Sequence, residues 1–130
     1  MVARNGPPLR GPGARRAALG ARGEEVASAY LRRAGMRVLA RNWRCPEGEL
    51  DIVAGEGAVL VVAEVKTRTS LRFGWPLEAV TESKHRRLRR LAHRWQAEHR
   101  AWGVRTRVDV VSVLLPPGGR IFVRHHRGVA

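Results

Sequence analysis

The run Val59–Arg68 constrains the fold of this chain more than any other segment. Its first half is apolar and rich in valine, and it leads directly into Glu64-Val65-Lys66. A short apolar run of β-branched residues predicts a buried strand. Side chains on a strand alternate between faces, so Glu64 and Lys66 share one face. Burying a charged side chain costs free energy. Two charged residues at the end of a buried strand therefore predict either a salt bridge where the strand reaches water or a functional site.

The preceding segment, residues 48–54, alternates acidic and apolar residues and predicts a second strand with Glu49 and Asp51 on one face. Gly55-Glu56-Gly57 is a turn signal between the two strands. A hairpin centred on Glu56-Gly57 places Glu49 opposite Glu64, with Asp51 as the diagonal neighbour. Clustered carboxylates repel one another unless a positive charge lies between them. Their hard oxygen atoms suit a divalent cation such as Mg²⁺.

A helix is predicted over residues 17–34, ended by Gly35. Counting 100° per residue gathers its apolar side chains into one sector. Glu24 falls at the edge of that sector, whereas Glu25 falls on the far side. The helical phase therefore selects Glu24 as the acid directed toward the core. The alternative is that both are ordinary surface acids.

A second helix is predicted over residues 76–102, because its apolar residues follow three/four spacing. Lys84 fills the one gap in that apolar stripe. Its ammonium group either reaches out to water along the apolar surface or faces the carboxylate cluster. The opposite face is rich in arginine, including Arg86, Arg87 and Arg90, and is either a solvated face or a phosphate-contact strip.

The remaining segments complete the predicted sheet. Strands are expected at 36–44, 105–115 and, as an edge strand, 120–126, and a loop at 69–76. Asp109 is expected to pair with an arginine rather than to bind metal. The resulting α-β-β-β-α-β order predicts a mixed β-sheet flanked by helices in the α/β class.

Charge and composition bound the class of partner. The 130 residues hold 25 Lys and Arg against 11 acids, a net charge of +14. This excess favours a polyanionic partner, nucleic acid first and a membrane surface second, over a merely solubilising surface. Residues 1–16 are predicted to be a disordered basic arm and residues 17–130 a single domain. A lone cysteine fits the reducing cytoplasm, and no apolar run reaches the roughly 20 residues that span a bilayer.

Taken together, these motifs resemble the PD-(D/E)xK nuclease superfamily and, more narrowly, the YraN-like family of small bacterial proteins. Leu50 stands where the superfamily pattern has proline, and Ala63 where a bulkier residue is expected; neither change removes a ligand. The resemblance runs from about Leu19 to Val113 and rests on Gly20-Ala21-Arg22-Gly23-Glu24, Arg41-Asn42-Trp43-Arg44, Gly48-Glu49-Leu50-Asp51, Glu64-Val65-Lys66-Thr67-Arg68, Phe73-Gly74, Glu78-Ala79-Val80, Lys84 and Val108-Asp109-Val110-Val111.

The resemblance implies a restriction-endonuclease-like fold and roles for individual residues. Asp51 and Glu64 would hold Mg²⁺ or Mn²⁺, with the carbonyl of Val65 and waters completing the shell. Lys66 would orient the attacking water or offset transition-state charge, and Glu24 would steer metal-bound water or help to hold a second ion. Accessory and nucleic-acid-binding roles fall to Glu49, Lys84, Arg68, Arg86, Arg87 and Arg90.

The function expected on these grounds is metal-dependent endonucleolytic hydrolysis of DNA phosphodiesters. Branched, recombination and repair intermediates are the candidate substrates, no membrane partner is expected, and a homodimer is compatible with the sequence. A non-catalytic nucleic-acid-binding module for DNA or RNA, and a basic RNA- or ribosome-associated protein, are the alternatives.

Overall fold

A five-stranded mixed sheet lies between two helices in the computed structural model, which describes residues 11–70, 72, 80–101 and 104–129. This arrangement confirms the predicted α/β class and is consistent with a restriction-endonuclease-like fold. The elements, in chain order, are α1 (Gly11–Arg33), β1 (Arg37–Cys45), β2 (Gly48–Glu56), β3 (Val59–Arg68), α2 (Glu82–Glu98), β4 (Arg105–Leu114) and β5 (Phe122–His126).

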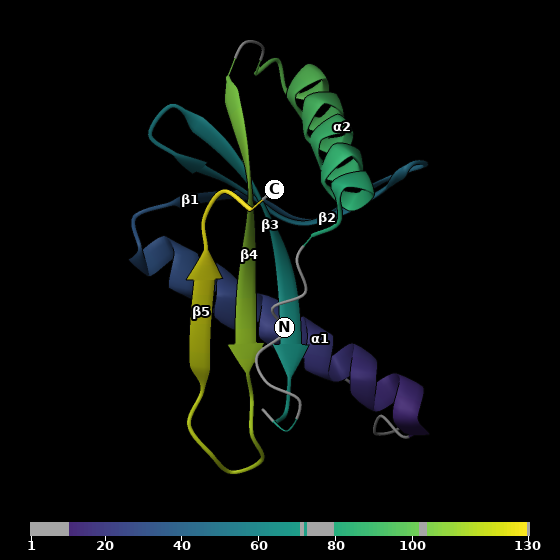
Figure 1. The fold of residues 1–130 in the computed structure, drawn as a ribbon, viewed down its shortest axis with the longest axis vertical. Coiled ribbons are helices and arrows are strands. Elements are labelled where there is room, and N and C mark those ends of the chain that lie inside the picture. Colours follow the sequence, from purple (N-terminus) through teal and green to yellow (C-terminus); the bar gives the residue numbers. More distant parts are fainter. Residues whose placement is uncertain (1–10, 71, 73–79, 102–103, 130) are drawn as a thin grey trace, which may run out of the picture.

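The strands lie in the sheet in sequence order, β1-β2-β3-β4-β5. All neighbours are antiparallel except β3 and β4, which are parallel and are joined by the crossover that contains α2 (Figure 1). Successive residues of β3 serve opposite faces: Val62 packs in the cluster with α2, and Val61 packs in the cluster with α1. The two helices therefore cover opposite faces of the sheet, as Figure 1 shows.

Both helices have bounds that differ from the predicted ones. α1 begins at Gly11, so residues 11–16 are helical, and the predicted disordered arm does not extend to residue 16. The run Ala14-Arg15-Arg16-Ala17-Ala18 has high helix propensity, which explains the earlier start. Residues 1–10 lie outside the described part of the chain. α2 is shorter than predicted because the side chain of Thr81 caps its N-terminus, accepting from the Lys84 amide at 3.1 Å.

The β2–β3 hairpin has a different register from the predicted one. Glu56 pairs with Val59, so the turn is Gly57-Ala58, with Gly57 at a φ of 58°. Such a positive φ favours glycine at the first central position of a two-residue turn, which explains why the hairpin turns there. Ile52 pairs with Ala63, so Asp51, rather than Glu49, is brought level with Glu64. The register moves by an even number of residues, so every side chain keeps its predicted face.

Gly23 allows α1 to approach β3 closely beside the carboxylates. A Cβ atom placed on Gly23 would lie 1.9 Å from the hydroxyl oxygen of Thr67 and 2.9 Å from its Cβ. Neither atom could accommodate that contact without moving the helix or the strand. Glu24 and Lys66 are the chain neighbours of these two closely packed residues.

Replacing Gly23 with alanine is therefore expected to destabilise the protein, even though alanine is the better helix former. Overpacking of this kind costs about 1–3 kcal/mol, and urea denaturation monitored by circular dichroism would measure it. The matched control is Gly20→Ala, because a Cβ at Gly20 meets nothing within 4 Å. A Gly23→Ala protein as stable as Gly20→Ala would contradict the close approach.

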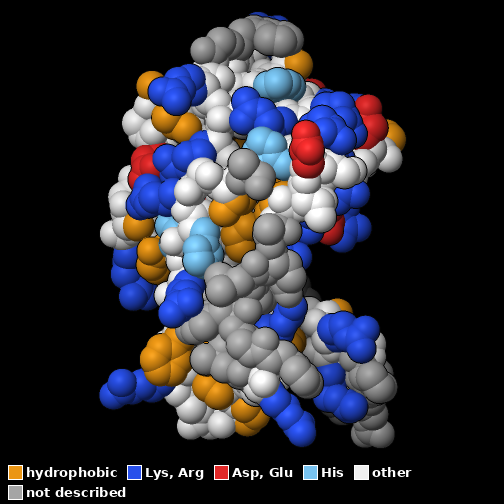
Figure 2. Space-filling view, viewed as in Figure 1, with side chains coloured by type: hydrophobic (Ala, Val, Ile, Leu, Met, Phe, Trp, Pro, Cys, Tyr) orange, Lys and Arg blue, Asp and Glu red, His pale blue; other side chains and the backbone are white. Residues whose placement is uncertain are grey.

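The surface is dominated by positive charge. Figure 2 shows lysine and arginine side chains spread over much of the visible face, with few acidic ones among them. In the residues that the structure describes, no helix is long and apolar enough to cross a membrane.

Candidate active site

Asp51 lies in the first half of β2, one residue before the part of the strand that pairs with β3. Its Oδ2 accepts a hydrogen bond from the backbone amide of Val65 at 2.9 Å, which ties the two strands together beyond the last paired residues. Among the described residues, no lysine, arginine or histidine forms an ion pair with Asp51. Its carboxylate is thus held in place by a neutral donor, with no cation among the described residues to balance its charge when it is ionised.

Three further carboxylates act on Asp51. Burial raises the pKa of Asp51 from 3.8 to about 7; the Val65 amide opposes this rise, and the charges of Glu64, Glu24 and Glu49 add to it. These acids come from α1, β2 and β3, so the fold brings within electrostatic reach of Asp51 the acids that the sequence analysis selected. The cost of ionising Asp51 there is what an added cation would relieve.

Glu64 lies between two lysines. Its Oε2 atom contacts the ammonium of Lys84 directly and lies 3.7 Å from that of Lys66. Burial alone would lower the pKa of Lys84, but the hydrogen bond and charge of Glu64 raise it above its ordinary 10.5. Of the two alternatives for Lys84, the structure therefore selects the one in which its ammonium faces the carboxylate cluster.

The two acids of α1 differ as their helical phase predicts. Glu24 is partly buried and Glu25 is exposed. Glu24 is also close enough to Asp51 for its charge to raise the Asp51 pKa. Glu24 accordingly belongs to the cluster, and Glu25 does not.

The carboxylates of the cluster can be compared with the ligands that a divalent cation needs. In the described part of the chain, no three Asp, Glu, His or Cys side chains form a ready-made metal-ligand group. Mg²⁺ commonly binds through one or two carboxylates, with waters and substrate phosphates completing its octahedron. Asp51 and Glu64 are carboxylates of this kind on adjacent strands, and ligand roles for them and for the Val65 carbonyl stay predictions.

The predicted nucleic-acid-binding arginines lie in different settings. Arg68 is exposed at the end of β3, and one of its guanidinium nitrogens donates to the Thr67 carbonyl at 3.1 Å. Arg86 pairs with Glu82 at 3.1 Å on the exposed side of α2. Arg87 and Arg90 line a pocket along the helix. The predicted loop motif at Phe73-Gly74 lies outside the described residues.

A second polar cluster surrounds Asp109, whose side chain is fully buried. Arg107 donates to both of its carboxylate oxygens, at 2.8 and 2.9 Å, as the expected arginine pairing requires. His125 Nε2 lies 2.7 Å from Oδ2, and the amide of Gly128 donates to Oδ1 at 2.9 Å. Burial alone would raise the pKa of Asp109, but Arg107, His125 and Gly128 together hold it well below its usual range. The part of His125 was missed, because only the β4–β5 register brings it to Asp109.

Comparison with known proteins places this chain in a family. Residues 23–113 match the sequence profile of a family described as Uncharacterised protein family UPF0102. A UPF0102 protein from Beutenbergia cavernae is 57% identical over 112 residues, covering 86% of this chain and 95% of that protein. One from Arthrobacter sp. (strain FB24) is 55% identical over 111 residues, covering 85% and 94%. The matched span includes every residue of the carboxylate cluster, and the chain belongs to the UPF0102 family.

Proposed function

We propose that this protein is a metal-dependent nuclease that hydrolyses DNA phosphodiesters at the Asp51–Glu64 cluster. One observation carries the proposal: acids from three separate elements act on Asp51, which has no ion-pair partner among the described residues. A protein that only binds polyanions has no use for clustered carboxylates, since they repel phosphate. The strongly basic surface supplies the attraction that brings the polyanion to them.

In this proposal, each side chain of the cluster has its own role in the reaction. A bound Mg²⁺ or Mn²⁺ supplies Lewis acidity at the scissile phosphate. Asp51 and Glu64, on adjacent strands, would hold it, and the Val65 amide fixes the direction of the Asp51 carboxylate. Lys66, on the same face as Glu64, would orient the attacking water or offset negative charge in the transition state. Glu24, whose charge acts on Asp51, would steer water at the site or help to hold a second ion.

Lys84 contacts the Glu64 carboxylate that a bound cation would also use, so the two would compete for it. This contact also favours the second candidate function, a non-catalytic nucleic-acid-binding module in which Lys84 permanently neutralises Glu64. The two functions differ in whether the protein binds a divalent ion at all.

The test is calorimetric titration of Mn²⁺ into the wild-type protein, with and without DNA, beside a cleavage assay on single-stranded, duplex, flapped and branched DNA. The nuclease proposal predicts metal binding that is lost in Asp51→Asn, and cleavage that requires the metal. Wild-type protein that binds no metal even with DNA present would exclude the nuclease and leave the binding module.

Binding to nucleic acid is expected to weaken steeply as salt rises, because neutralised phosphates release counterions. Replacing Arg86, Arg87 and Arg90 together with alanine should lower both the affinity and the salt slope, as measured by fluorescence anisotropy from low to moderate salt. The charge-matched control replaces Arg15, Arg32 and Arg33 of α1, which are exposed on the opposite face of the sheet. Equal losses in the two triple variants would show that α2 has no special part in binding.

Glu24→Gln is expected to impair metal-dependent cleavage far more than Glu25→Gln. Glu24 is close enough to Asp51 to act on its charge, whereas Glu25 is exposed on the neighbouring position of the same helix. General acid–base and water-steering groups typically contribute about 100-fold or more to the rate, so single-turnover cleavage rates would resolve the difference. A larger effect at Glu25 would remove Glu24 from the site.

A further inference from the structure

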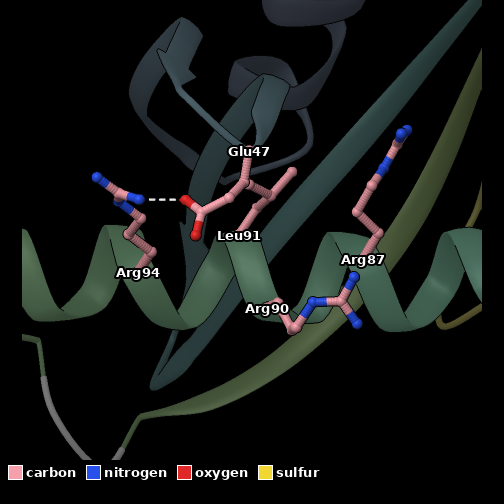
Figure 3. Close-up of a pocket in the computed structure, with 5 residues that line it drawn as sticks. All are labelled: Glu47, Arg87, Arg90, Leu91 and Arg94. Atoms are coloured by element: carbon pink, nitrogen blue, oxygen red, sulfur yellow. Dashed lines mark hydrogen bonds and ion pairs between the residues drawn. The ribbon is translucent and has the colours of Figure 1, made fainter.

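A pocket beside α2 opens under the tip of the β1–β2 hairpin (Figure 3). Its volume is about 270 Å³, and Glu47, Arg87, Arg90, Leu91 and Arg94 line it. The three arginines are spaced three and four residues apart, so they lie along one side of the helix. Glu47 is the one acid among the described residues that line the pocket, so the lining carries a net positive charge.

The backbone fixes Glu47 above the helix. Cys45 pairs with Gly48, so Pro46-Glu47 is a two-residue turn at the hairpin tip. A Cβ atom on Gly48 would lie 3.3 Å from a methyl carbon of Leu91, and Gly48 has a φ of 149°, which favours glycine. The hairpin therefore rests on α2 at Leu91. Figure 1 shows it passing behind the helix and emerging on the other side.

The arginines of the pocket differ in whether they form ion pairs. Arg94 pairs with Glu47 across the pocket and with Glu98 of its own helix at 3.1 Å. No carboxylate among the described residues forms an ion pair with Arg87 or Arg90. In Figure 3 these two side chains extend on the other side of Leu91 from the Arg94–Glu47 contact. Two guanidinium groups are thus available for an anion, and the third is held by an acid of the same pocket.

We propose that this pocket binds a phosphate group of nucleic acid, and that Glu47 is a built-in competing anion that releases Arg94 when phosphate enters. Guanidinium groups match phosphate oxygens with paired, charge-assisted hydrogen bonds. The side chains of Arg94 and Glu47 are 39% and 65% exposed, and exposed ion pairs of this kind are weak. An incoming phosphate can therefore replace the Glu47 carboxylate at little cost.

The inference rests on the proposed function, because the phosphate would belong to the same strand that reaches the carboxylate cluster. Lys84, which contacts Glu64, begins the row of cations on α2. At a helical rise of 1.5 Å per residue, Arg87 and Arg90 lie about 5 and 9 Å further along the axis. A phosphate held in the pocket would thus fix which phosphodiester of the strand lies at Asp51 and Glu64.

The test measures binding in the absence of divalent metal, so that cleavage plays no part. A labelled single-stranded oligonucleotide is titrated by anisotropy, and inorganic phosphate is used as competitor. Glu47→Gln is expected to tighten binding roughly two- to fivefold, the strength of an exposed ion pair. The matched control is Glu98→Gln. Glu98 is the other ion-pair partner of Arg94, so this change removes one negative charge in the same way, but Glu98 is not among the residues that line the pocket.

Two comparisons make the outcome specific. The gain from Glu47→Gln should disappear in an Arg94→Ala background, because Glu47 acts through Arg94. Arg90→Ala should weaken binding more than Arg86→Ala, since Arg86 is paired with Glu82. Equal effects of Glu47→Gln and Glu98→Gln, or no competition by inorganic phosphate, would overturn the proposal.

Oligonucleotides with and without a 5′-terminal phosphate identify the source of the group. A gain limited to the phosphorylated strand assigns the pocket to a terminal monoester, and an equal gain assigns it to an internal phosphodiester. If the protein passes these tests but never cleaves DNA, the nuclease proposal is refuted and the phosphate pocket is supported. If it cleaves DNA but Glu47→Gln has the same effect as Glu98→Gln, the phosphate pocket is refuted and the nuclease proposal is supported.

Discussion

Asp51→Asn is expected to abolish metal-dependent cleavage while making the metal-free protein more stable above pH 7. Loss of a ligand removes several kcal/mol of transition-state stabilisation, about a thousandfold or more in rate. The folded protein holds the Asp51 proton more tightly than the unfolded chain, because burial and neighbouring acids raise its pKa from 3.8 to about 7. Ionised Asp51 therefore destabilises the fold increasingly as pH rises from about 4 to about 7.

The gain in stability from Asp51→Asn should be at most about 4 kcal/mol at pH 8 and small at pH 4, following 1.36 kcal/mol per unit of pKa. Denaturant unfolding at the two pH values, in the presence of a chelator, would measure it. Glu64→Gln is the matched comparison. It too should abolish cleavage, but it should lower stability, because it leaves Lys84 partly buried without its partner. If both variants lost stability to a similar extent, the acids would be an ordinary salt-bridge network.

Asp109→Asn is expected to cost the most stability of any single change considered, about 3–5 kcal/mol, because it removes a fully buried charge that pairs with Arg107, although Arg107 keeps its second ion pair with Glu56. The pH dependence has the opposite sign to that of Asp51. Since the pKa of Asp109 is held below its usual range, its stabilising contribution is complete above the ordinary value near 3.8 and is lost as pH falls below that value.

Urea unfolding of Asp109→Asn beside Glu98→Gln would test this expectation. Glu98 also pairs with an arginine, but its side chain is 45% exposed, so its replacement should cost less than about 1 kcal/mol. Mn²⁺ binding by folded Asp109→Asn should match that of the wild type, because Asp109 lies outside the carboxylate cluster. An unfolding midpoint close to that of Glu98→Gln would show that the buried network contributes little.

The faces on which the acidic residues lie could be predicted because they depend on periodicity alone. Alternation on β2 and β3 fixes which side chains share a face, and an error of two residues in the hairpin register leaves that result unchanged. The helical phase separated Glu24 from Glu25 for the same reason. Each of these inferences used only residues close together in the chain.

What could not be predicted depends on contacts between distant segments. Nothing near His125 indicates that it meets Asp109, because the pairing of β4 with β5 sets that contact. The sequence alone left two positions open for Lys84, and the packing of α2 against the sheet decided between them. The pocket at Glu47 likewise requires a hairpin tip to rest on a helix that follows much later in the chain.

Because β3 pairs in parallel with β4, the centre of the sheet cannot close until α2 has been synthesised and folded back. Short turns connect β1, β2 and β3, so these strands can associate early. Closing the long connection between β3 and β4 costs more conformational entropy and is slow. During that interval β3 has an open edge, which is prone to pair with other chains. Asp51 and Glu64 already lie side by side then, without Lys84. Arrival of α2 therefore completes the sheet and brings Lys84 to Glu64 in one event. A truncated or stalled chain would carry the acidic cluster with Lys66 of β3 but without Lys84.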